Sequence, residues 1–333
     1  MLNHWIKGLK KEEFSLTQGM GIDNYLDEHH PDLLDKYKVG IISSNEHRPR
    51  AIRESLGTFQ NHFKNLPIID FGYFRKEDPS FNIQLINELM TSKILLMVID
   101  KDFRWFSEMV KGASMKSRTM NMCISNKLHF SEYGIPCDYI GFQRHLVELD
   151  HLNRIGDHSI NSMSLGKLRA EVEEVEPIMR DVDFLYFDIA GIRSSDVPGS
   201  QNSMPSGLTC EESCQLMKYA GRSNQLKMIV LGGDFKADDV TCNCLGEMLW
   251  YFLEGKSQIK QDHPSINQDF NEYIVEGEDF EESFTFVKNK STGRWWLSVD
   301  GEKNEFISCS YNEYHQTISN ELPDRLLKHL AKI

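Results

Sequence analysis

The sequence has no long run of apolar residues. Its longest apolar stretch, ILLMVID at 94–100, is about seven residues, whereas a membrane-spanning helix needs about 20. We therefore expect no membrane insertion. The first residues, MLNHWIKGLKKEEF, also lack the apolar segment of a secretory signal peptide. On both grounds we expect a cytoplasmic protein.

The sequence has fewer basic than acidic residues. The chain carries 37 Lys and Arg against 50 Asp and Glu, which gives a formal net charge of −13. A surface with this balance repels the phosphate backbone of nucleic acids at long range. We therefore expect no nucleic-acid partner.

Cysteine is too scattered for a disulfide framework. There are seven cysteines, an odd number that favours reduced thiols in a cytosol. Cys210, Cys214, Cys242 and Cys244 are close in sequence, but their spacing is not the C-x-x-C of common zinc sites. We expect these four to be incidental or buried thiols. Cys123, at the end of an apolar stretch, is expected to be inert packing and not a nucleophile.

The remaining composition is that of a globular protein with a large core. The 333 residues are 40% hydrophobic and 26% charged, with a mean hydropathy of −0.45, which excludes disorder and collagen-like structure. Short apolar stretches alternate with amphipathic ones, the pattern of a parallel sheet covered by helices on both faces. The stretches that predict strands are 38–43, 66–72, 93–99, 119–124, 137–142, 182–189 and 226–232. The stretches that predict helices are 49–63, 82–92, 164–181 and 210–222.

The last sixty or so residues have a different pattern. ESFTFVKNKSTGRWWLSVDGEKNEFISCSY alternates apolar and polar residues around STG and DGEKN, which predicts antiparallel hairpins. A final helix is expected in PDRLLKHLAKI, with Pro323 near its first turn. We expect three parts: an N-terminal helical and loop extension at 1–37, an α/β domain at 38–260, and a β appendage with a helix at 261–333.

Several segments resemble the ureohydrolases, the family of arginases, agmatinases and formimidoylglutamases. The resemblance is carried by VDFLYFDIAGIRSSDVPGSQNSMPSGLTCEESCQLMKYAG at 182–221, with YIGFQRH, PRAIRESL and LGEMLWYFLEGKS elsewhere. The ending, with FNEY, STGRWW, SYNEY and ELPDRLLK, is especially similar to a bacterial formimidoylglutamase-like or arginase-like branch. The resemblance implies a three-layer αβα sandwich around a parallel sheet of about eight strands.

The resemblance also implies a binuclear manganese site. Ureohydrolases cleave a guanidinium or formimino C–N bond with two Mn ions that share a bridging hydroxide. Their six ligands come from three strand ends: a His after Gly-Gly, an Asp-x-His-x-Asp, and an Asp-x-Asp. Carboxylates and imidazoles are the donors that Mn accepts.

This chain departs from the ligand pattern at all three strand ends. After the first strand it has Asp100 and Lys101 where glycines are expected, which puts the shape of that loop in doubt, with Asp102 near the His position. The family positions are occupied here by Asp102, Ser125, Lys127, His129, Asp188 and Ala190, with Arg193 in place of a third acidic residue. Only Asp102, His129 and Asp188 remain as metal donors. We expect Lys127 to fill the former metal position by pairing with Asp188 or Asp102.

The substrate-binding segments are also altered. The loop after the first strand is shortened to about 44–49. Glu212 matches the family carboxylate that grips a guanidinium, but with Thr209 it also forms a T-x-x-E capping box that needs no substrate. LGGDF at 231–235 resembles a family Gly-Gly motif, but it follows the strand that ends at Asp188 instead of preceding it, and it lacks the His. We therefore interpret it as an ordinary turn.

The sequence thus predicts a ureohydrolase-fold protein that has lost its metal centre, is not an enzyme, needs no cofactor, and acts as a binding or assembly component. The alternative is an active hydrolase of linear amidines with an atypical metal site built from Asp102, His129 and Asp188. A third hypothesis is a small-molecule sensor that keeps the cleft and Glu212. The partner is an unknown protein, and a homo-oligomer stays open.

An aromatic cluster in the appendage is the candidate partner surface. It consists of Arg294, Trp295, Trp296 and Phe306, and Trp and Arg are enriched at binding hot spots. The other interpretation is that the tryptophans seal the appendage onto the main domain.

Overall fold

A computed structural model describes most of the chain. The described residues are 2–25, 31–44, 47–63, 65–113, 119–129, 134–158, 161–201, 204–266, 269–276, 283–300 and 305–330. Across these residues no helix combines the length and apolarity required to cross a membrane.

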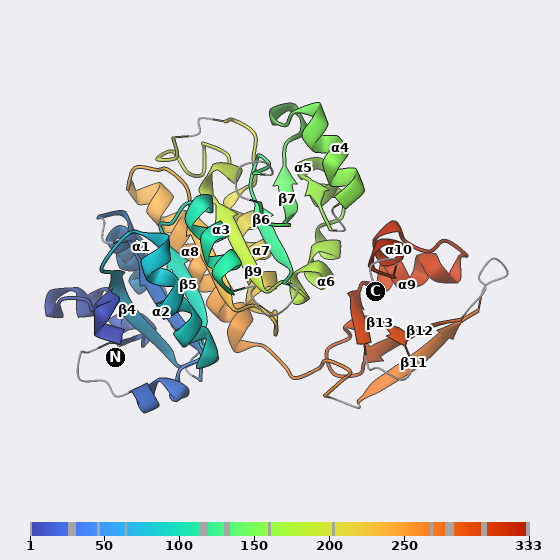
Figure 1. Cartoon of the computed structure of the whole chain (residues 1–333), viewed down its shortest axis with the longest axis horizontal. Helices are drawn as coiled ribbons and strands as arrows, with labels where there is room; N and C mark the ends of the chain where they lie inside the picture. Colours follow the sequence, from blue (N-terminus) through green and yellow to red (C-terminus); the bar gives the residue numbers. More distant parts are fainter. Residues whose placement is uncertain are drawn as a thin grey trace.

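A large, mostly parallel sheet forms the centre of the molecule (Figure 1). Its strands run in the order β1-β4-β3-β5-β10-β9-β6-β7-β8, with β2 paired to β4. The eight strands from β4 to β8 in this order are parallel, and β1 is antiparallel to β4. The bounds are β1 Ile6–Lys7, β2 Asp23–Asn24, β3 Val39–Ser43, β4 Ile68–Phe74, β5 Leu95–Ile99, β6 Asn121–Ile124, β7 Asp138–Phe142, β8 Met163–Ser164, β9 Phe184–Asp188 and β10 Met228–Gly232.

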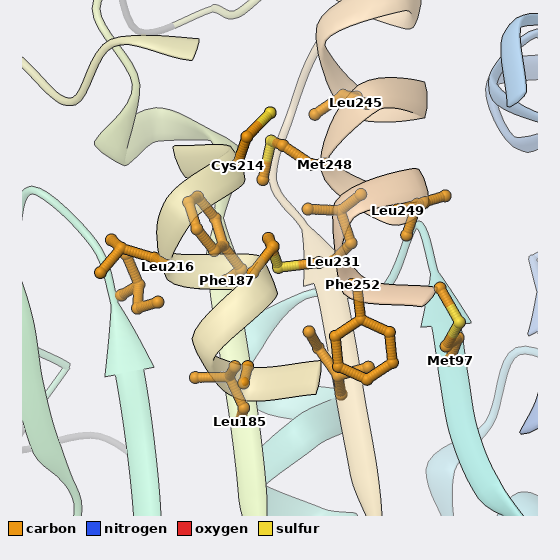
Figure 2. Packing of buried hydrophobic residues seen from close by; sticks show 14 of the residues in the cluster. Met97, Leu185, Phe187, Cys214, Leu216, Leu231, Leu245, Met248, Leu249 and Phe252 are labelled. Atoms are coloured by element: carbon orange, nitrogen blue, oxygen red, sulfur yellow. The ribbon is translucent and has the colours of Figure 1, made fainter. Parts of the chain in front are cut away.

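Helices cover both faces of this sheet, so the main unit has three layers. One face packs against α1, α6, α7 and α8, and the other packs against α2 and α3. Figure 2 shows the first interface, where Met248 and Phe252 of α8 belong to the same buried cluster as Leu231 of β10. The bounds are α1 His47–Thr58, α2 Pro79–Thr91, α3 Phe103–Ala113, α4 Leu149–His158, α5 Leu165–Ala170, α6 Val175–Arg180, α7 Cys210–Gly221 and α8 Asp239–Ser257. The short 3-10 helices are η1 Leu2–His4, η2 Lys11–Leu16, η3 Gln18–Met20, η4 Pro31–Lys36, η6 Arg144–Leu146, η7 Val172–Glu174 and η8 Ile189–Gly191.

The C-terminal part is a separate antiparallel sheet with its own small core. The strands β11 Phe270–Val275, β12 Phe284–Asn289, β13 Trp295–Asp300 and β14 Glu305–Cys309 pair in chain order. The helices α9 Tyr311–Ile318 and α10 Asp324–Leu330 complete it. Its buried cluster includes Phe286, Trp295 and Leu297.

The structure confirms the αβα fold with a parallel sheet of about eight strands and all seven predicted strands. The helix expected over 164–181 differs, because α5, η7 and α6 divide this segment. Pro177 lies in the first turn of α6, where its missing N–H group is tolerated. The 1–37 segment also contributes β1 and β2 to the sheet. The turn expected at DGEKN lies largely outside the described residues.

Candidate functional site

The candidate site lies at the carboxyl edge of the main sheet. Parallel strands end at the same edge, where α/β proteins usually bind ligands. Here β5, β10, β9 and β6 are neighbours, so the residues that follow them are brought together. These are Asp100 after β5, Gly233 after β10, Asp188 at the end of β9, and Ser125 after β6.

Asp188 is the centre of this edge and is 8% exposed. Its Oδ2 atom accepts a hydrogen bond from Ser125 Oγ at 3.0 Å and lies 3.6 Å from His129 Nε2. Its Oδ1 atom accepts from the backbone N–H of Ala190 at 2.9 Å. Gly233, at φ +124°, passes so close that a Cβ atom there would lie 3.0 Å from Asp188 Oδ1. A larger residue at 233 would therefore press on this carboxylate.

Ser125, His129 and Asp188 do not form a nucleophilic triad. In such a triad the imidazole uses one nitrogen for the serine and the other for the carboxylate. Here the same Nε2 atom faces both Ser125 Oγ, at 3.5 Å, and Asp188 Oδ2. Moreover, Ser125 donates its proton directly to Asp188. The arrangement therefore cannot activate Ser125 by way of His129.

The His129 ring is held by aromatic packing. It stacks on Phe103, with ring centroids 4.5 Å apart, and its edge faces Tyr186. Phe103 is the first residue of α3, so this helix helps to position the imidazole. The aromatic contacts leave His129 about one-quarter exposed.

Asp100 keeps the left-handed turn that glycine was expected to provide. Its φ is +65°, a conformation that Asp tolerates better than most residues. Its carboxylate accepts from Ser44 Oγ at 2.8 Å and pairs with Arg48 at 3.0 Å. Arg48 also pairs with Asp234 at 3.2 Å. The backbone therefore takes a positive φ at this position without a glycine.

Two residues expected at the site point elsewhere. Asp102 is exposed, and its Oδ1 accepts the backbone N–H of Trp105 at 2.8 Å, so it caps the start of α3. Lys101 is buried on the other side of the turn, where it pairs with Glu77 and lies over the rings of Phe74 and Trp105.

Lys127 is exposed at the end of β6. Among the described residues it forms no ion pair with Asp188 or Asp102, so it does not fill the space beside them. The side chain that lies next to Asp188 is instead that of His129. Arg193 points to Asp196, with Nε 2.7 Å from Oδ1.

Glu212 has both of the roles that its sequence position offered. It forms the capping box with Thr209 at the start of α7. In addition, its carboxylate binds a guanidinium group, which is provided by Arg169 of the same chain. Arg169 of α5 donates from Nε at 2.8 Å and from a terminal nitrogen at 3.1 Å to the two oxygens of Glu212. Burial acts to raise the pKa of Glu212, but Arg169 and the Thr209 N–H outweigh it and hold the pKa below its usual value.

Cys123 is fully buried in β6. Burial raises the pKa of its thiol well above the usual value, so the nucleophilic thiolate is not formed near neutral pH. This agrees with the expectation that Cys123 is packing.

The aromatic cluster of the appendage is mostly buried. Trp295 and Trp296 are 5% and 2% exposed, while Phe306 is half-buried. Arg180 of α6 lies over the Trp296 ring and donates to the carbonyl oxygens of Trp295 and Cys309. Arg294 pairs with Glu176 of α6 at 2.9 Å. The contacts of Trp296 and Arg294 with α6 favour the second interpretation, in which the cluster seals the appendage onto the main unit. The Trp295 ring instead packs inside the core of the appendage.

A large groove lies at the opposite, amino edge of the sheet. It has a volume of about 1580 Å³ and is lined by residues near the starts of β3, β5, β9 and β10. Four lysines line it: Lys38, Lys93, Lys227 and Lys256. Among the described residues that form its walls there is no Asp or Glu. Burial and the neighbouring charge of Lys38 lower the pKa of Lys256 to about 8.

Sequence reasoning missed Arg48, Arg169 and the groove. Each depends on segments that are far apart in the chain, such as α5 and α7 for Arg169 and Glu212. No local pattern marks these residues, because an arginine on a helix is ordinarily a solvated side chain.

Comparisons with known proteins give matches among solved structures alone. No family model matches the sequence, and no curated protein sequence matches it. The similar structures include formiminoglutamase from Trypanosoma cruzi, solved with Mn2+, at 13% identity and a TM-score of 0.61. This match covers 70% of this chain and 97% of that one. Formimidoylglutamase from Bacillus subtilis, at 14% identity and a TM-score of 0.60, covers 75% and 94%.

A third structure, a hypothetical agmatinase from Burkholderia thailandensis, has 14% identity and a TM-score of 0.53, with 68% and 87% covered. Identities this low establish a shared architecture and not a shared reaction. Together with the sheet order, they show that this chain has the ureohydrolase fold of the formimidoylglutamases and the arginase superfamily.

Proposed function

We propose that this protein is a ureohydrolase-fold binding component that does not carry out metal-dependent C–N hydrolysis. The observation that carries the proposal is the internal use of the carboxylates that the resemblance assigns to the site. Asp188 is bonded to Ser125 and Ala190, Asp102 caps α3, and Glu212 holds Arg169. Carboxylates that already accept hydrogen bonds within the chain have fewer lone pairs free for a metal or a substrate, which supports the proposal.

The donors at the carboxyl edge do not fit two Mn ions. A binuclear centre needs several carboxylates and imidazoles around ions roughly 3.5 to 4 Å apart. Within reach of Asp188 the described residues offer one imidazole, from His129, and the hydroxyl of Ser125. Among the described residues one group of three or more clustered metal donors is present, and it does not include Asp188.

The Arg169–Glu212 pair supports the same proposal. A guanidinium substrate would need the Glu212 carboxylate, and the bidentate pair already satisfies both of its oxygens. Arg169 also donates to the carbonyl oxygen of Gly207 at 2.8 Å, which fixes its position further. The chain thus supplies its own guanidinium at the place where the resemblance would put one from a substrate.

We place the binding role in the groove at the amino edge, with an acidic segment of a protein partner as its occupant. Lys38, Lys93 and Lys256 line the groove without ion-pair partners among the described residues, in a chain of net charge −13. A cationic groove on an anionic protein attracts negative segments and repels a second copy of the same surface.

Two measurements test whether the protein lacks hydrolase activity: its metal content and its turnover of substrates. The full-length protein is incubated with excess Mn, desalted and measured by elemental mass spectrometry. Release of urea, ammonia or formamide is then assayed with arginine, agmatine and formiminoglutamate. We expect no stoichiometric Mn and no turnover. About two Mn per chain, with turnover that Asp188→Ala abolishes, would contradict the proposal and establish the alternative of an active amidine hydrolase.

The test of the groove uses a poly-glutamate peptide. We expect it to bind the wild-type protein in a salt-sensitive manner, and we expect Lys38→Glu/Lys93→Glu to weaken binding strongly. Lys288→Glu/Lys290→Glu, at the end of β12 in the appendage, makes the same change of net charge and should leave binding unchanged. Equal binding by the groove variant and the control would remove the case for the groove.

A further inference from the structure

A cluster of sulfur and carboxylate atoms joins α7 to α8. Cys210 and Cys214 are one turn apart on α7, and Glu247 lies on the neighbouring α8. One ligand atom from each of these three residues lies within 4.8 Å of the others. The Cys210 Sγ and Glu247 Oε2 atoms are 3.7 Å apart.

Cys244 is a fourth member of the cluster. It precedes Glu247 by three residues on α8, which places the two side chains on the same face of the helix. Its thiol reaches the Cys210 sulfur and, with that of Cys214, lowers the pKa of Cys210 by hydrogen bonding. Two helices therefore contribute two ligands each.

These separations suit a tetrahedral ion. Zinc binds thiolate sulfur at about 2.3 Å, which separates neighbouring sulfurs in a tetrahedron by about 3.8 Å. One ligand atom each from Cys210, Cys214 and Glu247 already lies within 4.8 Å of the others, and a bound ion would draw these atoms and the Cys244 thiol to that spacing. Residues at i and i+4 on one helix share a face, so the missing C-x-x-C spacing, which argued against zinc in the sequence, is not needed when the ligands come from packed helices.

The surroundings allow an ion to enter and favour its charge. Cys214 and Cys244 are each 4% exposed, whereas Glu247 is exposed and Cys210 is half-buried. Figure 2 shows Cys214 near Met248 and Leu245, on the side of α7 that faces α8. None of the ion pairs among the described residues involves Glu247, and the adjacent Glu211 adds negative potential.

We propose that Cys210, Cys214, Cys244 and Glu247 form a closed zinc site that fastens α7 to α8. Closed four-ligand zinc sites are typically structural, so its role is to stabilise the helix pair and not to supply catalysis. Thiolate ligands are soft, whereas Mn prefers oxygen donors. This site is therefore distinct from a manganese centre, and it neither requires nor excludes the function proposed above.

The experiment uses Co2+ as a spectroscopic substitute for zinc in the full-length protein. The protein is first reduced and stripped with a chelator. We expect one Co2+ per chain, with a thiolate-to-cobalt charge-transfer band and the intense visible bands of a tetrahedral site. Added Zn2+ should displace the cobalt and raise the melting temperature.

Variants assign the site. Cys210→Ser/Cys214→Ser should lose the charge-transfer band, and Glu247→Gln, which changes an exposed side chain and leaves the core intact, should bind Zn2+ more weakly. Cys242→Ser, a buried cysteine on the same helix, is the matched control and should keep the band, as should Asp188→Ala. Absence of the band in the wild-type protein, its persistence in the double variant, or Glu247→Gln binding as tightly as wild type would overturn the proposal.

Discussion

The guanidinium of Arg169 lies across the carboxylate of Glu212 in a two-point contact, with nitrogen-to-oxygen distances of 2.8 and 3.1 Å. This pair joins α5 to the start of α7, and under the proposed function it occupies the carboxylate that a guanidinium ligand would need. Because both side chains are partly exposed, the pair contributes about 1 kcal/mol or less to stability. We therefore expect its removal to change ligand binding more than stability.

Replacement of Arg169 by Ala should make the Glu212 carboxylate accessible to a ligand. We expect a small loss of stability and a new increase in melting temperature with added agmatine, because Glu212 is released to a ligand. Differential scanning fluorimetry measures both. Glu212→Gln in the same background is the control and should remove the agmatine effect. An equal agmatine effect in the wild-type protein would show that Arg169 does not block the site.

Trp296→Ala should destabilise the attachment of the C-terminal sheet. Trp296 is 2% exposed, and the Arg180 guanidinium lies 4.9 Å from its ring centre, so truncation leaves a cavity at a cost of about 3–5 kcal/mol. Urea denaturation and limited proteolysis at the connection to the sheet measure this cost. Ile274→Ala, in the same sheet but 65% exposed, should be nearly neutral. A folded, protease-resistant Trp296→Ala protein that has lost a partner would instead favour a partner surface.

Stability should increase as the pH rises from about 8 towards 10.5 because of Lys256. Its pKa in the folded protein is lowered to about 8 from 10.5, so the unfolded chain binds more protons in this interval. The contribution is about 1–3 kcal/mol after allowance for solvent. We expect Lys256→Met to be more stable than wild type at pH 7 and to lose this part of the pH dependence, measured by urea denaturation. Identical pH profiles for the two proteins would contradict the assignment.

Two substitutions of Asp100 distinguish the stability cost of backbone strain from that of lost side-chain contacts. Both Asp100→Gly and Asp100→Ala lose the bonds to Ser44 and Arg48. At a φ of +65° only the alanine variant also carries left-handed strain, about 1–2 kcal/mol. We expect Ala to be less stable than Gly by this amount in urea denaturation, which is the reverse of their usual order. An alanine variant as stable as the glycine variant would mean that the turn changes shape.

The main sheet was predictable because its strands are buried on both faces. Stretches such as 93–99 and 226–232 are almost wholly apolar, and each contains a strand of the structure. The two-residue strands β1, β2 and β8 were missed, since so short a segment has no periodicity. The helix α3 was also missed, because its apolar residues Phe103 and Trp105 directly follow the polar residues 100–102.

The candidate site was predictable in outline only. In the structure the strand ends bring Asp188, Ser125 and His129 together. Sequence position could not show that Asp102 turns to cap α3, that Lys127 faces solvent, or that Arg169 reaches Glu212. These outcomes depend on side-chain direction and reach, which a one-dimensional alignment of motifs does not contain.

The two edges of the C-terminal sheet are unequal. The outer strand β14 is secured by α6, where Arg180 donates to the Cys309 carbonyl and Asp181 accepts from Ser308. The other outer strand, β11, pairs with β12 on one side, and no described strand pairs with its other side. An added strand could therefore extend this sheet in one direction only, beside β11. The exposed Glu272 on β11 works against self-association there, because like charges would meet when two copies pair edge to edge.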